Sequence, residues 1–162
     1  MKSLVAVQDR IARAAETSGR DPASVTLIAV SKTHPVSAIQ EAYEAGHRDF
    51  GESRLQELIP KWECLPKDIR WHFIGKLQSN KAKRAAQMGV VIHTIESAHQ
   101  LREIAKGTPV EGLDALIEVN TTGEEQKSGI YPQALDELVS EVLNYPNVRL
   151  RGLMTLGHAH RN

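Results

Sequence analysis

Short apolar runs alternate with amphipathic segments along most of the chain. The apolar runs predict strands at 25–31, 47–51, 70–74, 90–95, 114–119 and 148–154. The segments between them predict helices at about 35–46, 53–62, 78–88, 97–106 and 132–144, and Leu4, Val7 and Ile11 mark one face of a further helix before the first strand. Strands that alternate with single helices predict a parallel sheet with right-handed crossovers.

Two architectures satisfy this pattern: an open doubly wound sheet and a (β/α) barrel. The chain carries neither a GxGxxG fingerprint nor a P-loop, which argues against the common nucleotide-binding open sheets. The regular recurrence of the strands favours the barrel. A closed barrel needs eight strands and typically about 250 residues, whereas this sequence predicts six strands in 162 residues. We therefore expect a single domain over 1–162 with an α/β fold of the (β/α)8 TIM-barrel type that lacks strands seven and eight, or else an open sheet.

Polar residues gather where the predicted strands end. Lys32 follows the first strand, Ser53 the second and Asn120 the fifth, while His72 lies within the third and Met154 ends the sixth. In both architectures ligands bind at the carboxyl ends of the strands. The sequence therefore predicts a small-molecule site at this end of the sheet.

Lys32 ends the run "VTLIAVSKTH" at 25–34, whose first part is typical of a strand buried on both faces. Side-chain alternation places Lys32 on the same face as Ile28 and Val30. If that face points into a barrel, partial desolvation favours the neutral amine, which is the nucleophilic form and can bond an aldehyde as a Schiff base. The alternative is a lysine that extends from the strand end into solvent.

The other candidates carry alternatives as well. His72 is either a hydrogen-bond donor in the site or a core histidine whose bonds are satisfied. Asn120 and Lys127 either contact a ligand or shape the loop after the fifth strand. His158 and His160 have no acidic or cysteine partner near them in the sequence, so we expect no metal site there.

Composition narrows the range of functions. Lys and Arg number 20 and Asp and Glu also number 20, and this balance gives no support for a nucleic-acid or membrane-surface partner. The single cysteine, Cys64, excludes an intramolecular disulfide and a cysteine-based zinc cluster. With no membrane-length apolar run, the sequence predicts a cytoplasmic protein.

Five segments at the strand ends together resemble a known family. They are "AVSKT" (29–33), "FGESRLQE" (50–57), "WHFIGKLQSNK" (71–81), "VNTTGEEQKSG" (119–129) and "GLMT" (152–155). In this order they resemble the pyridoxal phosphate homeostasis proteins of the YggS/PROSC type, single-domain relatives of the alanine racemase barrel. The resemblance spans roughly residues 4 to 157.

The resemblance implies a (β/α)8-type barrel that holds pyridoxal 5′-phosphate (PLP) as a Schiff base on Lys32. It also implies that Ser53, His72, Asn120 and Met154 contact the cofactor. Family members regulate the supply of PLP and affect amino-acid and keto-acid metabolism without an established turnover. A PLP carrier or regulator is therefore expected rather than an enzyme, with small amino or keto acids as possible partners and an oligomeric state that the sequence does not fix.

This sequence departs from the family pattern at two places. Ser53 stands where the family usually has Asn, and a polar contact to the cofactor is expected to weaken. The family's "SMGMS" segment and following "R-G" turn, which hold the PLP phosphate after strands seven and eight, have no match here. We therefore expect weaker PLP binding than in an intact relative, or none.

Three alternatives stay open. The first is a PLP-dependent amino-acid racemase, which needs acid/base groups on both faces of the cofactor. The second is a PLP-free lyase that uses Lys32 on a keto substrate. The third is a truncated fragment, non-functional or regulatory, with weak or no PLP binding.

Overall fold

The structure, a computed structural model, describes residues 2–157. Its six strands form one parallel sheet: β1 (Ala29–Val30), β2 (Asp49–Glu52), β3 (Arg70–Phe73), β4 (Val91–Ile95), β5 (Leu113–Glu118) and β6 (Val148–Met154). The helices are α1 (Lys2–Thr17), η1 (Pro22–Ser24), α2 (Val36–Glu44), α3 (Leu55–Cys64), α4 (Ser79–Gln87), α5 (Ala98–Gly107), η2 (Pro132–Ala134) and α6 (Leu135–Val142). None of these helices is long and apolar enough to cross a membrane.

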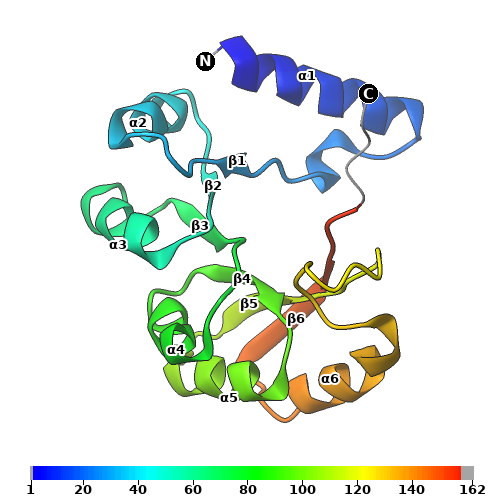
Figure 1. Cartoon of the computed structure of the whole chain (residues 1–162). Coiled ribbons are helices and arrows are strands. Elements are labelled where there is room, and N and C mark those ends of the chain that lie inside the picture. Colours follow the sequence, from blue (N-terminus) through cyan, green and yellow to red (C-terminus); the bar gives the residue numbers. More distant parts are fainter. Residues whose placement is uncertain (1, 158–162) are drawn as a thin grey trace.

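The order of the strands decides between the two expected architectures. A doubly wound sheet reverses its strand order at a switch point, whereas here β1 to β6 lie side by side in chain order and every pair is parallel. The barrel-type prediction is therefore confirmed. No pairing joins β1 to β6 in residues 2–157, so the sheet is an open arc with helices α2 to α6 on its outside (Figure 1).

The outer face of the arc forms the hydrophobic core. Phe50, Trp71 and Ile117 point from their strands toward the helices and are almost fully buried. Alternation along each strand then turns the intervening residues to the opposite side, which we call the inner face. Gly51 and His72 belong to this inner face, which corresponds to a barrel interior.

β1 differs most from its prediction. The run at 25–31 was expected to be a strand buried on both faces, but only Ala29 and Val30 form a strand, and Val30 is 45% exposed. The prediction was wrong because β1 is an edge strand that pairs with β2 alone. The other elements agree with the sequence within a few residues, although the helix expected at 132–144 begins with the short turn η2.

Helix α5 shows how local signals and packing agree. Ser97 caps it, because its hydroxyl accepts a hydrogen bond from the amide of Gln100. At the other end, Gly107 allows α5 to approach α4 closely. A Cβ atom on Gly107 would lie 2.2 Å from the carbonyl oxygen of Lys83.

The Gly107→Ala variant tests this contact. The added methyl group has to push two packed helices apart, so we expect the free energy of unfolding to fall by about 1–3 kcal/mol, measured by urea denaturation. Gly157→Ala is the matched control, because no atom lies within 4 Å of its added Cβ. Equal stabilities for the two variants would contradict the close approach of α4 and α5.

Candidate functional site

A cavity of about 610 Å³ opens at the carboxyl ends of the strands. Residues from the ends of four strands line it: Lys32 after β1, Ser53 after β2, Ile74 and Lys76 after β3, and Glu118 and Asn120 at the end of β5. Its volume falls within the roughly 300–1,000 Å³ typical of small-molecule sites. We call it the Lys32 cavity, and it brings together three of the five predicted site residues.

Lys32 lies on the predicted face but is not desolvated. Val30 pairs with Gly51, and a Cβ on Gly51 would contact Ile28 and Ile74 at 3.0 and 3.2 Å, so these residues share the inner face. Lys32, two residues after Val30, continues this alternation into the cavity. The expected partial burial is wrong, since Lys32 is exposed. The reason is the edge position of β1, which leaves one side of the turn uncovered in the part of the chain described.

A buried ion pair lies on the opposite side of the sheet, directly behind Lys32. The ammonium of Lys61, from α3, donates to Oε1 of Glu52 at 2.6 Å and to the carbonyl oxygen of Ser31 at 2.9 Å. The hydroxyl of Ser31 donates to the same Glu52 oxygen at 2.8 Å. Glu52 is fully buried and Lys61 is 7% exposed. The residue before Lys32 is therefore fixed through both its carbonyl and its side chain.

The residue after Lys32 is fixed by another carboxylate of α3. The amide of Thr33 donates to Oε2 of Glu57 at 2.9 Å, and this oxygen lies 3.9 Å from the Lys61 ammonium. Thr33 has a φ of 65°, a left-handed conformation that is uncommon for a β-branched residue. The turn that carries Lys32 is thus held from both sides in a conformation that a free chain rarely adopts.

Ser53 lies half-buried in the wall of the cavity. Its backbone packs so tightly against the next strand end that a Cβ on Gly75 would lie 2.0 Å from the Ser53 carbonyl oxygen. Only glycine fits at this close approach. The strand ends of β2 and β3 are therefore in direct contact beside Lys32.

Asn120 lines the cavity, but its polar atoms shape the loop that follows β5. Its amide nitrogen donates to the carbonyl oxygens of Glu124 and Lys127, and its side-chain oxygen accepts from the amides of Thr122 and Gly123. The loop-shaping alternative therefore describes its contacts. Its contact with a cofactor stays a prediction.

Glu118 is a carboxylate of the cavity that the sequence reasoning passed over. It is 4% exposed at the end of β5. Burial raises its pKa above the ordinary value, and the charge of Glu96 adds to this, while the ammonium of Lys76 acts in the opposite direction. Alternation from Asn120 was the signal that could have found it, since residues two apart share a face.

His72 lies on the inner face but does not line the Lys32 cavity. One ring nitrogen is 2.8 Å from Oδ1 of Asp49 and the other is 2.9 Å from Nε2 of His93. Burial lowers the pKa of His72 although Asp49 opposes the shift, and burial together with His72 lowers the pKa of His93 to about 4. Of the two alternatives, the structure shows a core histidine whose two ring nitrogens both have hydrogen-bond partners. Contact of His72 with a cofactor stays a prediction.

The remaining candidates lie apart from the cavity. Met154 is half-buried at the end of β6, where it pairs with Glu118, so it is one strand away from a cavity residue. His158 and His160 lie outside the described residues. Among the described residues no group of three or more His, Cys, Asp or Glu side chains could hold a metal ion.

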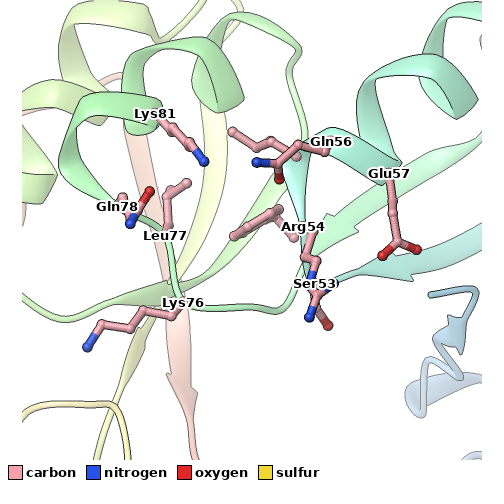
Figure 2. Close-up of a pocket in the computed structure, with 10 residues that line it drawn as sticks. Ser53, Arg54, Gln56, Glu57, Lys76, Leu77, Gln78 and Lys81 are labelled. Atoms are coloured by element: carbon pink, nitrogen blue, oxygen red, sulfur yellow. The ribbon is translucent and has the colours of Figure 1, made fainter. Parts of the chain in front are cut away.

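A second hollow of about 530 Å³ adjoins the first and shares Ser53 and Lys76 with it. Figure 2 shows its wall, where Lys81 from α4 extends toward Gln56 from α3. Apolar side chains of the core form part of this wall. The site region is therefore a pair of neighbouring hollows that meet at Ser53 and Lys76, after the ends of β2 and β3.

Comparison with known proteins agrees with the fold and the family expected from the sequence. The sequence profile of the family described as "Alanine racemase, N-terminal domain" matches residues 3–160. The pyridoxal phosphate homeostasis protein of Pseudomonas aeruginosa is 41% identical over 158 residues, which cover 96% of this chain and 69% of the relative. Its counterpart from Escherichia coli is 43% identical over 160 residues, covering 95% of this chain and 68% of the relative.

Solved structures are similar over most of the chain as well. PipY of Synechococcus elongatus, solved without PLP, has a TM-score of 0.79 at 35% identity and covers 94% of this chain and 73% of its own. The same protein with PLP bound has a TM-score of 0.73 at 36% identity, covering 91% and 70%. An alanine racemase from Bacillus anthracis, 18% identical with a TM-score of 0.63, covers 94% and 39% and shares the fold.

Fold and site together define a barrel-type α/β protein with a lysine after its first strand that lines a cavity of small-molecule size. The chain belongs to the alanine racemase N-terminal-domain family and, within it, to the pyridoxal phosphate homeostasis proteins.

The histidine pair predicts a pH dependence of stability. In the unfolded chain, a histidine takes up a proton near its ordinary pKa of 6.5. In the folded protein both rings stay neutral at lower pH, because their pKa values are lowered. Their contribution to stability is therefore complete above about pH 6.5 and is lost as the pH falls toward 4. We expect the unfolding temperature of His93→Gln to fall less steeply than that of the wild type over this interval.

The exposed His99 on α5 supplies the control for this measurement. His99→Gln should retain the steep wild-type dependence. Parallel curves for the wild type and His93→Gln, measured by calorimetry from pH 7 to pH 4, would contradict the assignment of two neutral histidines.

Proposed function

We propose that the chain binds PLP and takes part in intracellular PLP homeostasis, with the cofactor attached to Lys32 as a Schiff base. The observation that carries the proposal is the position of Lys32 in a cavity of small-molecule size, in a chain of this family. The PLP-bound structure of PipY supports the choice of cofactor. We include a cytoplasmic location and the treatment of 1–162 as one PLP-binding unit in the proposal.

The residues of the cavity fit the chemistry of this cofactor. A primary amine matches the aldehyde, and the ammonium groups of Lys76 and Lys127 supply positive charge for a phosphate. Both cations already face carboxylates, Lys76 facing Glu96 at 3.7 Å and Lys127 facing Glu124 at 3.2 Å. A phosphate would compete with these ion pairs, and the expectation of weak PLP binding stays a prediction that a titration can measure.

The attachment step needs no further reactant, and water is its only by-product. The neutral ε-amine of Lys32 adds to the aldehyde carbon, the carbon–oxygen bond breaks, water leaves, and a carbon–nitrogen double bond forms. When bound, PLP supplies an electron sink for amino-acid chemistry. The protein's part in this step is to hold the amine where the aldehyde enters.

The Lys32→Ala variant tests the attachment. After incubation with PLP and reduction with borohydride, mass spectrometry should find the cofactor on Lys32 of the wild type, and the variant should lose that label. Lys106→Ala is the control and should keep the label on Lys32, because Lys106 is an exposed lysine of α5 that lines neither hollow. A wild type labelled only at other lysines, or not at all, would overturn the proposal.

A racemase is the second candidate, and Glu118 is the observation that favours it. A buried carboxyl group with a raised pKa in the same cavity as Lys32 is a suitable acid/base partner. The three tyrosines do not line this cavity: Tyr43 bonds Asp68, Tyr131 lies before η2, and Tyr145 packs on the core. Small amino and keto acids are the partners we propose in either case.

Exchange in deuterated water separates the two functions. With PLP and L-alanine present, a racemase incorporates deuterium at Cα, and Glu118→Gln should lower the rate by about 100-fold or more. A carrier leaves the Cα hydrogen in place, which is the result that we expect, measured by proton NMR. Deuterium incorporation that depends on both Lys32 and Glu118 would establish the racemase instead.

A further inference from the structure

We propose that Glu52, Lys61 and Glu57 are positioning residues for Lys32: they hold the turn formed by Ser31, Lys32 and Thr33 from behind the sheet and thereby set how fast the Lys32 amine captures an aldehyde. This inference rests on the proposed function, because it concerns the same lysine. It adds residues that do not line the Lys32 cavity.

The first support is that β1 cannot fix the turn by itself. The strand has two residues and a single neighbour. Beyond it, one further backbone bond to β2 joins the amide of Ser31 to the carbonyl oxygen of Gly51 at 2.9 Å, and within the turn the amide of His34 donates to the carbonyl oxygen of Ser31 at 3.1 Å. An edge strand held on one side by so few bonds is prone to fraying, so additional contacts have to define the path of residues 31–33.

The second support is where the buried charges direct their bonds. Lys61 and Glu52 bond each other, but each also bonds Ser31, at its carbonyl oxygen and its hydroxyl. Glu57 takes the amide of Thr33. These contacts attach residues on both sides of Lys32 to α3 and to the end of β2, while Lys32 itself stays directed toward the cavity.

The third support is that the ion pair is poorly explained by stability alone. A buried ion pair is often replaceable by apolar residues of similar size without loss of stability, because desolvation offsets the attraction between the charges. In this pair Oε2 of Glu52 is buried without a hydrogen-bond partner, which adds to the desolvation cost. Apolar residues could fill the same space, but they could not bond the carbonyl and hydroxyl groups of Ser31.

Position matters for the reaction because the amine has to approach the aldehyde carbon along a defined direction. A displacement of about 1 Å can slow such a step by about 100-fold. The left-handed Thr33 makes the turn sensitive to the loss of its contacts, since that conformation is unfavourable without them. The bonds from α3 therefore select the conformation in which the Lys32 amine faces the cavity.

The experiment separates positioning from stability with a double replacement. Glu52→Leu with Lys61→Met removes both charges together and leaves no unpaired ion, so the fold should survive, whereas either single change would leave one charge buried alone. We expect the double variant to unfold within a few degrees of the wild type. It should attach PLP at least about tenfold more slowly, followed by the rise of Schiff-base absorbance in stopped-flow mixing.

A second pair of variants tests, without PLP, whether Glu57 holds the turn at residues 31–34. In hydrogen exchange followed by mass spectrometry, Glu57→Ala should expose the Thr33 amide and raise exchange of the peptide that covers residues 31–34 by about tenfold or more. Glu57→Gln keeps an oxygen that can accept this bond, so it should largely restore protection. The control is the exposed α5 pair, where Lys106→Met with Glu103→Gln should change neither exchange nor attachment rate.

The outcomes are distinct. A double variant that folds and attaches PLP at the wild-type rate overturns the inference. If the double variant does not fold, unchanged exchange at residues 31–34 in Glu57→Ala overturns it instead, and raised exchange with slower attachment in that variant supports it. If the wild type does not attach PLP at Lys32, the proposed function fails, and the exchange measurements still decide whether α3 holds the turn.

Discussion

The hydrogen bonds from the buried Glu52–Lys61 pair to Ser31 are the contacts on which the site depends. They join the carboxyl end of β2, helix α3 and the turn after β1 at one point behind the sheet. Without them, a two-residue edge strand would be the main support for Lys32, the residue that we propose to bind PLP. The position of Lys32 on the inner face is thus determined by the charged pair Glu52–Lys61 on the outer face.

Close backbone approaches complete the arrangement around the cavity. Gly75 lets the end of β3 lie against the Ser53 carbonyl, and Gly51 leaves space between Ile28 and Ile74 on the inner face. On the far side, Asn120 organises the loop after β5 through its side-chain amide. The walls of the cavity are therefore built from short-range contacts at strand ends, as in other barrel-type proteins.

Much of this architecture could be predicted because it depends on periodicity. Alternating apolar runs predict where the strands lie along the chain, although their order in the sheet required the structure. The ends of those strands predict Lys32, Ser53 and Asn120 as site residues, which the structure brings to one cavity. Side-chain alternation also placed Lys32 on the correct face. The family resemblance, which rests on residues at the same strand ends, agrees with the profile match over residues 3–160.

What could not be predicted depends on contacts between distant segments. From the sequence, Lys61 is expected to be an ordinary polar residue on the exposed face of an amphipathic helix. Nothing near it in the sequence indicates that it is buried against Ser31, thirty residues earlier. The pairing of His72 with Asp49 and His93 likewise requires three adjacent strands. The burial expected for Lys32 was wrong because a sequence pattern does not show which strand lies at the edge of a sheet.

The most direct measurement is a crystal structure of the protein after soaking with PLP. The account predicts continuous density from the Lys32 Nζ atom to the cofactor, with the Lys61 ammonium still within hydrogen-bond distance of the Ser31 carbonyl oxygen. Cofactor density joined to another lysine, or joined to Lys32 with the Lys61–Ser31 contact absent, would contradict it.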